Sequence, residues 1–301
     1  MPNLRGSTYS RNHTTLDPCA SCTDFWDFAL EESAVLDYPT VIDFILAETG
    51  HPDLHFAGYS MGTTHYLILL SERPEYNAKI RSGHLLGPTA FGGNGTNPFI
   101  APLAGHAEVI RDGIHALGLR EFMPNLHQLQ AVLFGHLCHT SSAYLDVCTS
   151  IFSLAAGMDF GRLNKTLVPL YMTHMPGGAS VSQFVHFAQL FRNGGEFVKF
   201  DHGAEVNRMR YGAEHPPKYD VGKVTAPTAL YVGDADGFAT EADSLKLAGR
   251  LGGPVIHHEV VAAEGWTHID FILAVEAGEL VNRKVVDLIV KRDLEMGSEG
   301  V

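Results

Sequence analysis

The sequence predicts an α/β fold in which a mostly parallel sheet is interrupted by a mostly helical insertion. Three observations lead to this prediction. Residues 35–86 read as helix, strand, tight turn, helix and strand, which is the rhythm of a parallel sheet with covering helices. Over residues 89–219 that rhythm stops, and apolar helical segments follow a glycine-rich loop. From residue 228 the alternation of strand and helix resumes.

The first part of the sheet is predicted from its apolar spacing and its turn residues. Apolar residues three and four apart from Val35 to Leu46 predict an amphipathic helix. Asp37 is its expected N-cap, Pro39 suits the first turn, and Gly50 ends the helix. The segments that follow are predicted as a strand over 54–58, a helix over 63–72 and a strand over 80–86.

The rest of the chain divides into the insertion and the second part of the sheet. Helical segments of the insertion are expected at 126–137, 144–156 and 183–191. The second part is predicted as a strand over 228–232, a helix over 240–250, a strand over 255–261 and a helix over 277–291 with a frayed tail. The expected units are therefore 1–88 (core, first part), 89–219 (insertion) and 220–301 (core, second part).

Composition favours a globular enzyme and disfavours a nucleic-acid partner. Of the 301 residues, 45% are hydrophobic and 18% are charged, as in chains that bury a core. The formal net charge of −13 would repel nucleic acid and anionic membrane surfaces. No apolar stretch reaches the length of a membrane span, so no transmembrane segment is expected.

The pentapeptide Gly58-Tyr59-Ser60-Met61-Gly62 has the G-x-S-x-G pattern and stands between a predicted strand and a predicted helix. In that setting the serine sits on a sharp, strained turn, and we expect side chains at positions 58 and 62 to collide with the neighbouring strand and helix. The hydroxyl of Ser60 is then exposed at a helix N-terminus, and the Met61 N–H faces a developing oxyanion. Ser60 is the candidate nucleophile.

A serine nucleophile needs a base and an orienting carboxylate. After the strand at 228–232, Asp234 and Asp236 are both candidates for the acid, and His268 follows the next strand as candidate base. The same residues allow two other interpretations. A calcium loop starting at Asp234 would need a glutamate where Leu245 stands, and His268 alone would also suit a helix cap.

Cysteines and glycosylation sequons give weaker evidence, and it concerns the compartment of the protein. Glycosylation sequons begin at Asn12, Asn94 and Asn164, which together with a close cysteine pair favours secretory chemistry, although no signal peptide is visible. The pair Cys19-x-x-Cys22 lacks the setting of a redox motif, and no zinc-finger spacing occurs, so we interpret the pair as incidental.

Taken together, these motifs resemble the acid lipase family of the α/β-hydrolases, which includes gastric lipase and lysosomal acid lipase. The matching segments extend over nearly the whole chain and are 5–13, 25–28, 58–64, 71–77, 176–180, 200–203, 216–219 and 268–271.

The resemblance implies an α/β-hydrolase fold with residues 89–219 as a cap over the active site. It implies Ser60 as nucleophile, His268 as base and Asp236 as acid, with Asp234 as the fallback. It also implies a cap disulfide between Cys138 and Cys148, for which two buried thiols are the alternative.

By the same resemblance the expected function is hydrolysis of carboxylic esters of neutral lipids, such as triacylglycerol or cholesteryl ester, at a lipid-droplet or micelle interface. No metal or organic cofactor is expected, and the expected location is secreted or lysosomal. Family members carry strands and a His-Gly-Leu-like loop before the segment that matches Arg5, whereas here the only His-Gly pair is His202-Gly203. The alternatives are a catalytically impaired lipid-binding relative or the truncated product of a secreted lipase gene.

Overall fold

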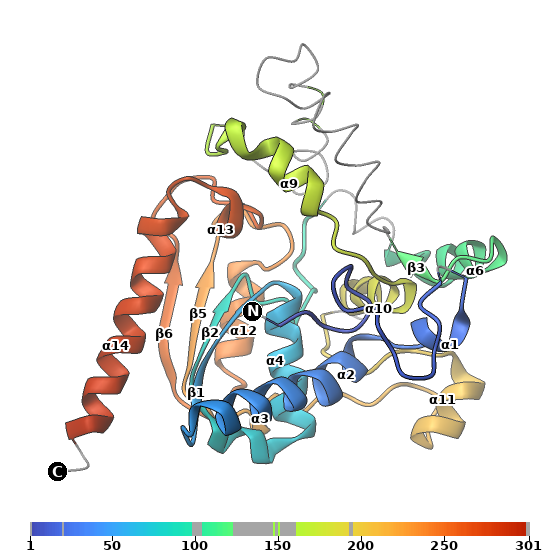
Figure 1. The fold of residues 1–301 in the computed structure, drawn as a ribbon, viewed down its shortest axis with the longest axis horizontal. Helices are drawn as coiled ribbons and strands as arrows, with labels where there is room; N and C mark the ends of the chain where they lie inside the picture. The colour runs from blue at the N-terminus through green and yellow to red at the C-terminus, as the bar shows by residue number, and fades with distance from the viewer. Residues whose placement is uncertain are drawn as a thin grey trace.

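The computed structural model describes residues 2–19, 21–97, 104–122, 147, 150, 161–192 and 195–298. In these ranges a four-stranded parallel sheet lies between layers of helices (Figure 1). Its strands, in order across the sheet, are β1 (Leu54–Tyr59), β2 (Ile80–Leu86), β5 (Thr228–Val232) and β6 (Val255–Val260). The predicted α/β architecture is confirmed, and each strand matches its predicted range to within one residue.

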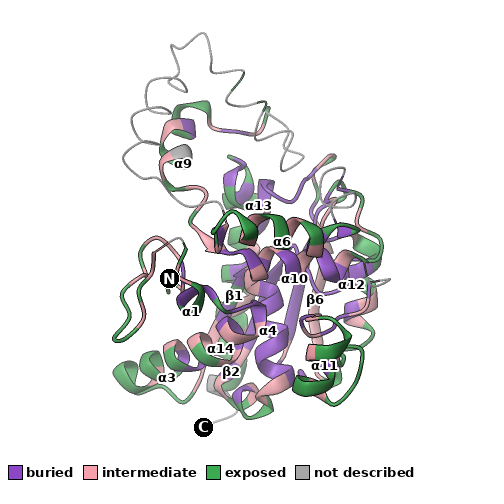
Figure 2. Ribbon diagram, turned by 90° about the vertical axis from the view of Figure 1, so that its right-hand side faces the viewer, coloured by how far each residue is buried: buried purple, intermediate pink, exposed green. Residues whose placement is uncertain are grey.

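Outside the insertion, the helices and helical turns are α1 (Thr23–Trp26), α2 (Leu30–Glu32), η1 (Ser33–Asp37), α3 (Tyr38–Thr49), α4 (Met61–Glu72), η2 (Pro74–Lys79), η4 (Val221–Lys223), α12 (Glu241–Ala248), α13 (Asp270–Leu273), η5 (Gly278–Asn282) and α14 (Arg283–Ser298). Figure 2 shows α4 buried along its length, whereas α3 presents many exposed residues.

Both faces of the sheet are covered by apolar side chains, as expected for a parallel sheet. Because side chains alternate along a strand, Leu85 and Leu230 pack in a core with residues of α3, α4 and α12. Their neighbours Leu86 and Tyr231 pack in a second core with Trp266 and residues of α13 and α14. The two cores hold the carboxyl ends of the strands, and the loops that follow them, in fixed positions.

Two predictions at helix ends are wrong. The helix predicted from Val35 is continuous with a wide turn, η1, so Asp37 has helical backbone angles and makes no cap hydrogen bond. Its carboxylate instead accepts hydrogen bonds from Arg5, a partner 32 residues away. The last helix also extends to Ser298, where the sequence predicts a frayed tail after residue 291.

The insertion contains α6 (Ala107–Ala116), β3 (Glu121–Phe122), η3 (Lys165–Leu167), α9 (Val168–His174), β4 (Ala179–Ser180), α10 (Val181–Arg192) and α11 (Ala204–Tyr211). The helix predicted over 183–191 is present as α10, and the antiparallel pair of β3 with β4 was not predicted. The helices predicted over 126–137 and 144–156 lie outside the described residues. The division at residues 88 and 219 stays a prediction.

Candidate active site

Ser60 stands at a sharp turn between β1 and α4. It is the only non-glycine residue of the described chain with a positive φ, +51°, a strained conformation typical of functional sites. Its N–H donates to Leu86 O on the adjacent strand (3.0 Å), and its carbonyl accepts from Thr63 Oγ1 (2.6 Å). These bonds hold the hydroxyl of Ser60 at the carboxyl edge of the sheet.

The two glycines of the pentapeptide differ in their need to be glycine. A Cβ at Gly58 would lie 2.8 Å from the Phe56 ring and 3.0 Å from the backbone of Gly62, as expected of a crowded turn. A Cβ at Gly62 would meet only the Tyr38 hydroxyl, at 3.7 Å. The expected collision at position 62 is therefore wrong, because α4 leaves ordinary contact distance there.

Ser60, His268 and Asp236 form one hydrogen-bonded row. His268 Nε2 is 2.7 Å from Ser60 Oγ, and His268 Nδ1 is 2.7 Å from Asp236 Oδ2. The Asp236 side chain is fully buried and that of His268 is 8% exposed. A carboxylate accepts only, so the imidazole carries its proton on Nδ1 and leaves Nε2 to accept from the serine hydroxyl. This arrangement can deprotonate Ser60.

The two candidate acids have different partners. Asp236 Oδ1 accepts from the N–H groups of Phe238 (2.8 Å) and Ala239 (2.9 Å), which aims Oδ2 at His268. Asp234 is exposed and accepts from the N–H groups of Gly265 (2.9 Å) and Trp266 (2.7 Å). Asp234 thus braces the loop before His268, whereas Asp236 contacts the imidazole.

The loop that carries His268 is held by further residues that the sequence analysis missed. Asp270 Oδ2 accepts from both the N–H (2.7 Å) and the hydroxyl (2.8 Å) of Thr267. The Tyr59 hydroxyl donates to His268 O (2.9 Å). Burial, together with the nearby carboxylates of Asp236 and Asp270, raises the pKa of Tyr59, so its phenol stays protonated and donating.

Gly87 is a second missed position. It follows β2 with φ +57°, and a Cβ there would lie 2.9 Å from His268 Cε1 and 3.3 Å from Asp236 Oδ2. Only glycine combines this backbone angle with so close an approach. No sequence pattern marked Gly87, because its neighbours come from loops about 150 and 180 residues later.

Beside Ser60 and His268 lies an apolar cavity of about 480 Å³. Its other lining residues are Thr89, Met175, Phe184, Phe187, Ala188, Phe191, Phe238 and Ile269. Apart from Ser60, Thr89 and His268 the lining is apolar, so the cavity suits a hydrocarbon chain whose reactive end reaches the serine.

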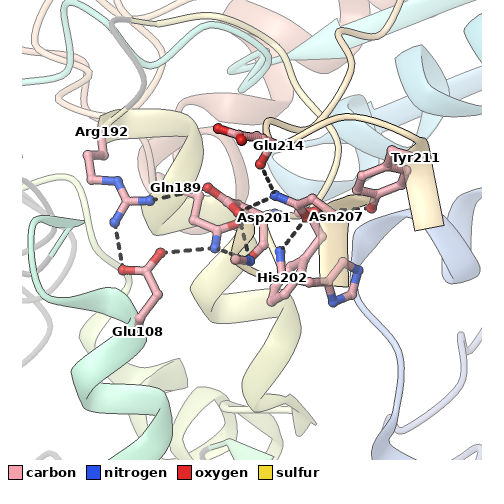
Figure 3. A network of polar contacts seen from close by, with 10 residues as sticks. Glu108, Gln189, Arg192, Asp201, His202, Asn207, Tyr211 and Glu214 are labelled. Carbon is pink, nitrogen blue, oxygen red and sulfur yellow. Dashed lines mark hydrogen bonds and ion pairs between the residues drawn. The ribbon is translucent and has the colours of Figure 1, made fainter. Parts of the chain in front are cut away.

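Helix α10 contributes several of these lining residues, and a polar network fixes it within the insertion (Figure 3). The buried amide of Gln189 donates to Glu108 on α6 (3.1 Å) and to Asp201 O (2.9 Å), and accepts from Asp201 N (2.9 Å). Arg192 donates to the second oxygen of Glu108 (2.6 Å). Because these groups are satisfied and partly buried, they give the cavity wall a fixed position.

Of the other predicted site residues, Met61 directly follows Ser60, whereas the predicted glycosylation residues are not among the described residues that line the cavity beside Ser60. Met61 opens α4, and the first N–H groups of a helix have no intrahelical partner. Asn12 and Asn94 are exposed, but the Asn94 amide donates to Asp243 (2.8 Å); Asn164 is half-buried and accepts from the Thr166 N–H (3.1 Å). Cys138 and Cys148 lie outside the described residues.

One cysteine prediction is wrong. Cys19 and Cys22, interpreted above as incidental, form a disulfide. The short spacing allows it because the Cys22 N–H donates to Cys19 O (3.0 Å), a turn that brings the two Cα atoms to 5.1 Å. With Asp17 they are the one cluster of metal-type ligands in the described ranges, and the disulfide removes the thiolates that a metal would need.

Comparison with known proteins places the chain among hydrolases. A family model described as the α/β-hydrolase fold matches residues 1–107. Lipase 3 of Drosophila melanogaster is 38% identical over 95% of this chain and 71% of its own length. Human lysosomal acid lipase/cholesteryl ester hydrolase is 33% identical over 97% of this chain and 70% of its own. Rat gastric triacylglycerol lipase is 31% identical over 97% and 71%.

Among solved structures, a protein from Sulfolobus solfataricus that is assigned as a lipase is similar to this chain, with a TM-score of 0.55. It is 15% identical and covers 90% of this chain and 68% of its own, which supports the fold alone. In the described ranges, none of the helices combines the length and the apolar character needed to cross a bilayer.

Proposed function

The chain belongs to the acid lipase family of the α/β-hydrolases, and from this premise we propose that it is a serine hydrolase acting on carboxylic esters of neutral lipids. The observation that carries the proposal is the row of 2.7 Å contacts from Ser60 through His268 to Asp236 beside an apolar cavity. Triacylglycerol and cholesteryl ester are the proposed substrates, since lipases of both kinds are among its relatives.

The chemistry follows from these contacts. His268 Nε2 takes the proton as Ser60 Oγ attacks the ester carbonyl carbon, and Asp236 stabilises the imidazolium that forms. The oxyanion of the tetrahedral intermediate faces the Met61 N–H at the start of α4. When the intermediate collapses, the C–O bond to the alcohol breaks and His268 gives the alcohol its proton. Water then attacks the acyl carbon with His268 as base. The bond between that carbon and Ser60 Oγ breaks, His268 returns the proton to Ser60, and the fatty acid leaves.

Labelling with a serine-directed fluorophosphonate tests the proposal. We expect one labelled residue, Ser60, and no labelling of the Ser60→Ala variant. His268→Gln should slow labelling strongly, because the hydroxyl is a weak nucleophile without its base. If the folded wild-type chain binds a fatty acid but is never labelled, the chain is a lipid-binding relative and the enzyme proposal is wrong.

We also propose contact with a lipid-droplet or micelle surface and a secreted or lysosomal location, with glycans on Asn12, Asn94 and Asn164 and a Cys138–Cys148 disulfide. The names of the lysosomal and gastric relatives support the location. A mass shift on enzymatic removal of N-glycans tests the sequons, and peptide mapping without reduction tests the disulfide. An unglycosylated chain from secreting cells would reject this part.

A further inference from the structure

We propose that residues 5–11, here called the N-terminal strap, position the insertion's side of the apolar cavity and thereby set a preference for long acyl chains. This inference rests on the proposed ester hydrolase function. Met175 and Phe184 both line the cavity, and both lie in parts of the insertion that the strap contacts or braces.

The strap begins on the core of the molecule. The Arg5 guanidinium donates twice to Asp37 Oδ1 (2.8 and 2.6 Å), and the Arg5 N–H donates to Asp37 Oδ2 (3.0 Å). Gly6 follows with φ +77°, packed so closely that a Cβ would lie 2.7 Å from Phe28 and 2.8 Å from Trp26. This end of the strap therefore has little freedom to move.

The middle of the strap holds the chain on both sides of Met175. The N–H and the hydroxyl of Thr8 both donate to Gly177 O (2.8 and 3.0 Å). The Tyr9 hydroxyl lies 2.8 Å from His174 Nδ1. Since His174 and Gly177 flank Met175 in the sequence, these contacts set where the Met175 side chain enters the cavity wall.

The end of the strap braces Phe184 through Glu121. Arg11 makes a bidentate contact with Glu121, with both N–O distances 2.8 Å, and the Glu121 side chain is only 2% exposed. Glu121 belongs to β3, and the next residue, Phe122, stacks on Phe184 with ring centroids 4.2 Å apart. A buried bidentate pair has a defined geometry. Arg11 therefore fixes the position of β3, and with it the position of the Phe122–Phe184 stack in the cavity wall.

The disulfide loop supports Arg11 from the other side. Arg11 Nη2 also donates to Pro18 O (2.9 Å), and the guanidinium lies 5.2 Å from the centre of the Trp26 ring. The Trp26 indole N–H in turn donates to Cys19 O (2.9 Å). The guanidinium is thus held in place before it meets Glu121, and less side-chain freedom is lost in forming the pair.

Loss of the strap contacts should change selectivity more than catalysis. Phe187, Ala188 and Phe191 stand further along α10, near the Gln189 network, and the triad residues stand on the sheet-forming part of the chain. A short acyl group needs only the space beside Ser60, whereas a long one must also pack against Met175 and Phe184.

Activity on two esters tests this inference. We expect Arg11→Met to lower the ratio of kcat/KM for p-nitrophenyl palmitate to that for p-nitrophenyl acetate about tenfold, with kcat for the acetate within about twofold of wild type. The control is Arg81→Met, which breaks partly buried ion pairs with Asp53 (2.8 Å) and Asp293 (2.6 Å) near the amino ends of β1 and β2, away from the cavity, and should leave the ratio unchanged. An unchanged ratio in folded Arg11→Met, or an equal loss on both esters, would overturn the inference.

Two additions keep the test decisive. Arg11→Met leaves Glu121 buried and unpaired, so the double variant Arg11→Met/Glu121→Met gives the same readout if the single variant does not fold. If wild type turns over neither ester, the proposed function fails. The inference is then judged by the Kd for a fluorescent long-chain fatty acid, expected to rise about tenfold in the double variant and to stay unchanged in Arg81→Met. An equal Kd in all three proteins would reject it.

Discussion

Asp234 and Asp236 have different partners although only Ala235 separates them. Asp236 is buried against His268, and Asp234 braces the backbone at Gly265 and Trp266. At the scale of single residues, the direction in which a carboxylate points decides whether it can orient the imidazole.

Substitution of the two acids tests this assignment. We expect Asp236→Asn to lower kcat by about 10⁴, because the imidazole loses the carboxylate that holds its tautomer. Asp234→Asn should cost less than about tenfold, since one oxygen remains to accept from the loop. Steady-state kinetics on a soluble ester measure both, and the opposite ranking would move the acid to Asp234.

Gly87 allows a test of how closely the site is packed. Gly87→Ala puts a methyl group about 2.9 Å from the imidazole at a positive φ, so His268 must shift. We expect a loss of kcat of about 10², the scale of an ångström misplacement of a catalytic group. Gly113→Ala is the control, since a Cβ there meets nothing within 4 Å. Wild-type rates for Gly87→Ala would show that the loop adapts.

At the scale of elements, the pattern of apolar residues predicts that a helix or strand exists better than it predicts where that helix or strand begins and ends. The apolar spacing before Gly50 identified α3, but Arg5 binds Asp37, the residue expected to cap it. Because η1 already forms a helical turn before α3, Asp37 is not at the start of the helical run, and its carboxylate is free to form a charge-assisted pair. That pair depends on a residue 32 positions away, and a local pattern contains no sign of it.

The disulfide loop is an element whose removal should be measurable. Replacing both cysteines by serine (Cys19→Ser/Cys22→Ser) opens a four-residue loop, for which the chain-entropy relation gives a loss of about 2 kcal/mol in the free energy of unfolding. Denaturant unfolding measures this loss. Equal stability of the wild type and the double variant would mean that the loop contributes nothing.

At the scale of the whole molecule, buried histidines link stability to pH. Burial is the main cause that lowers the pKa of His65 to about 3 and that of His186 to about 4, although the hydrogen bond of His186 to Val198 O acts in the opposite direction. In the described chain neither ring nitrogen of His65 has a hydrogen-bond partner. The fold therefore holds both rings neutral.

Because these histidines stay neutral in the fold, the free energy of unfolding falls as the pH falls. Unfolded histidines titrate near pH 6.5, so below that pH the unfolded chain binds protons that the folded chain excludes. This contribution to stability is complete above about pH 6.5 and is lost as the pH falls toward 4 and 3. At pH 5 each of the two histidines lowers the free energy of unfolding by about 2 kcal/mol relative to pH 7.

Replacing one buried histidine tests this linkage. In His65→Leu the difference in unfolding free energy between pH 7 and pH 5 should shrink by about 2 kcal/mol. Leu69→Met, a change of similar volume on the same helix, should leave the difference as in wild type. Denaturant unfolding at the two pH values gives the comparison, and an unchanged difference in His65→Leu would contradict the prediction.

The sequence by itself determined the alternation of strands and helices, the Ser60 turn and the order of acid and histidine. These depend on spacing and on residue types within a few positions. Only the tertiary structure decided that Asp236 rather than Asp234 meets His268, that Gly87 lies against the imidazole, and that the strap holds the walls of the cavity. Those contacts join residues from 32 to more than 150 positions apart. The contacts among Asp236, His268 and Gly87 exist because the parallel order β1-β2-β5-β6 brings the loops after several strands to one edge, and the strap contacts exist because the insertion folds back beside residues 5–11.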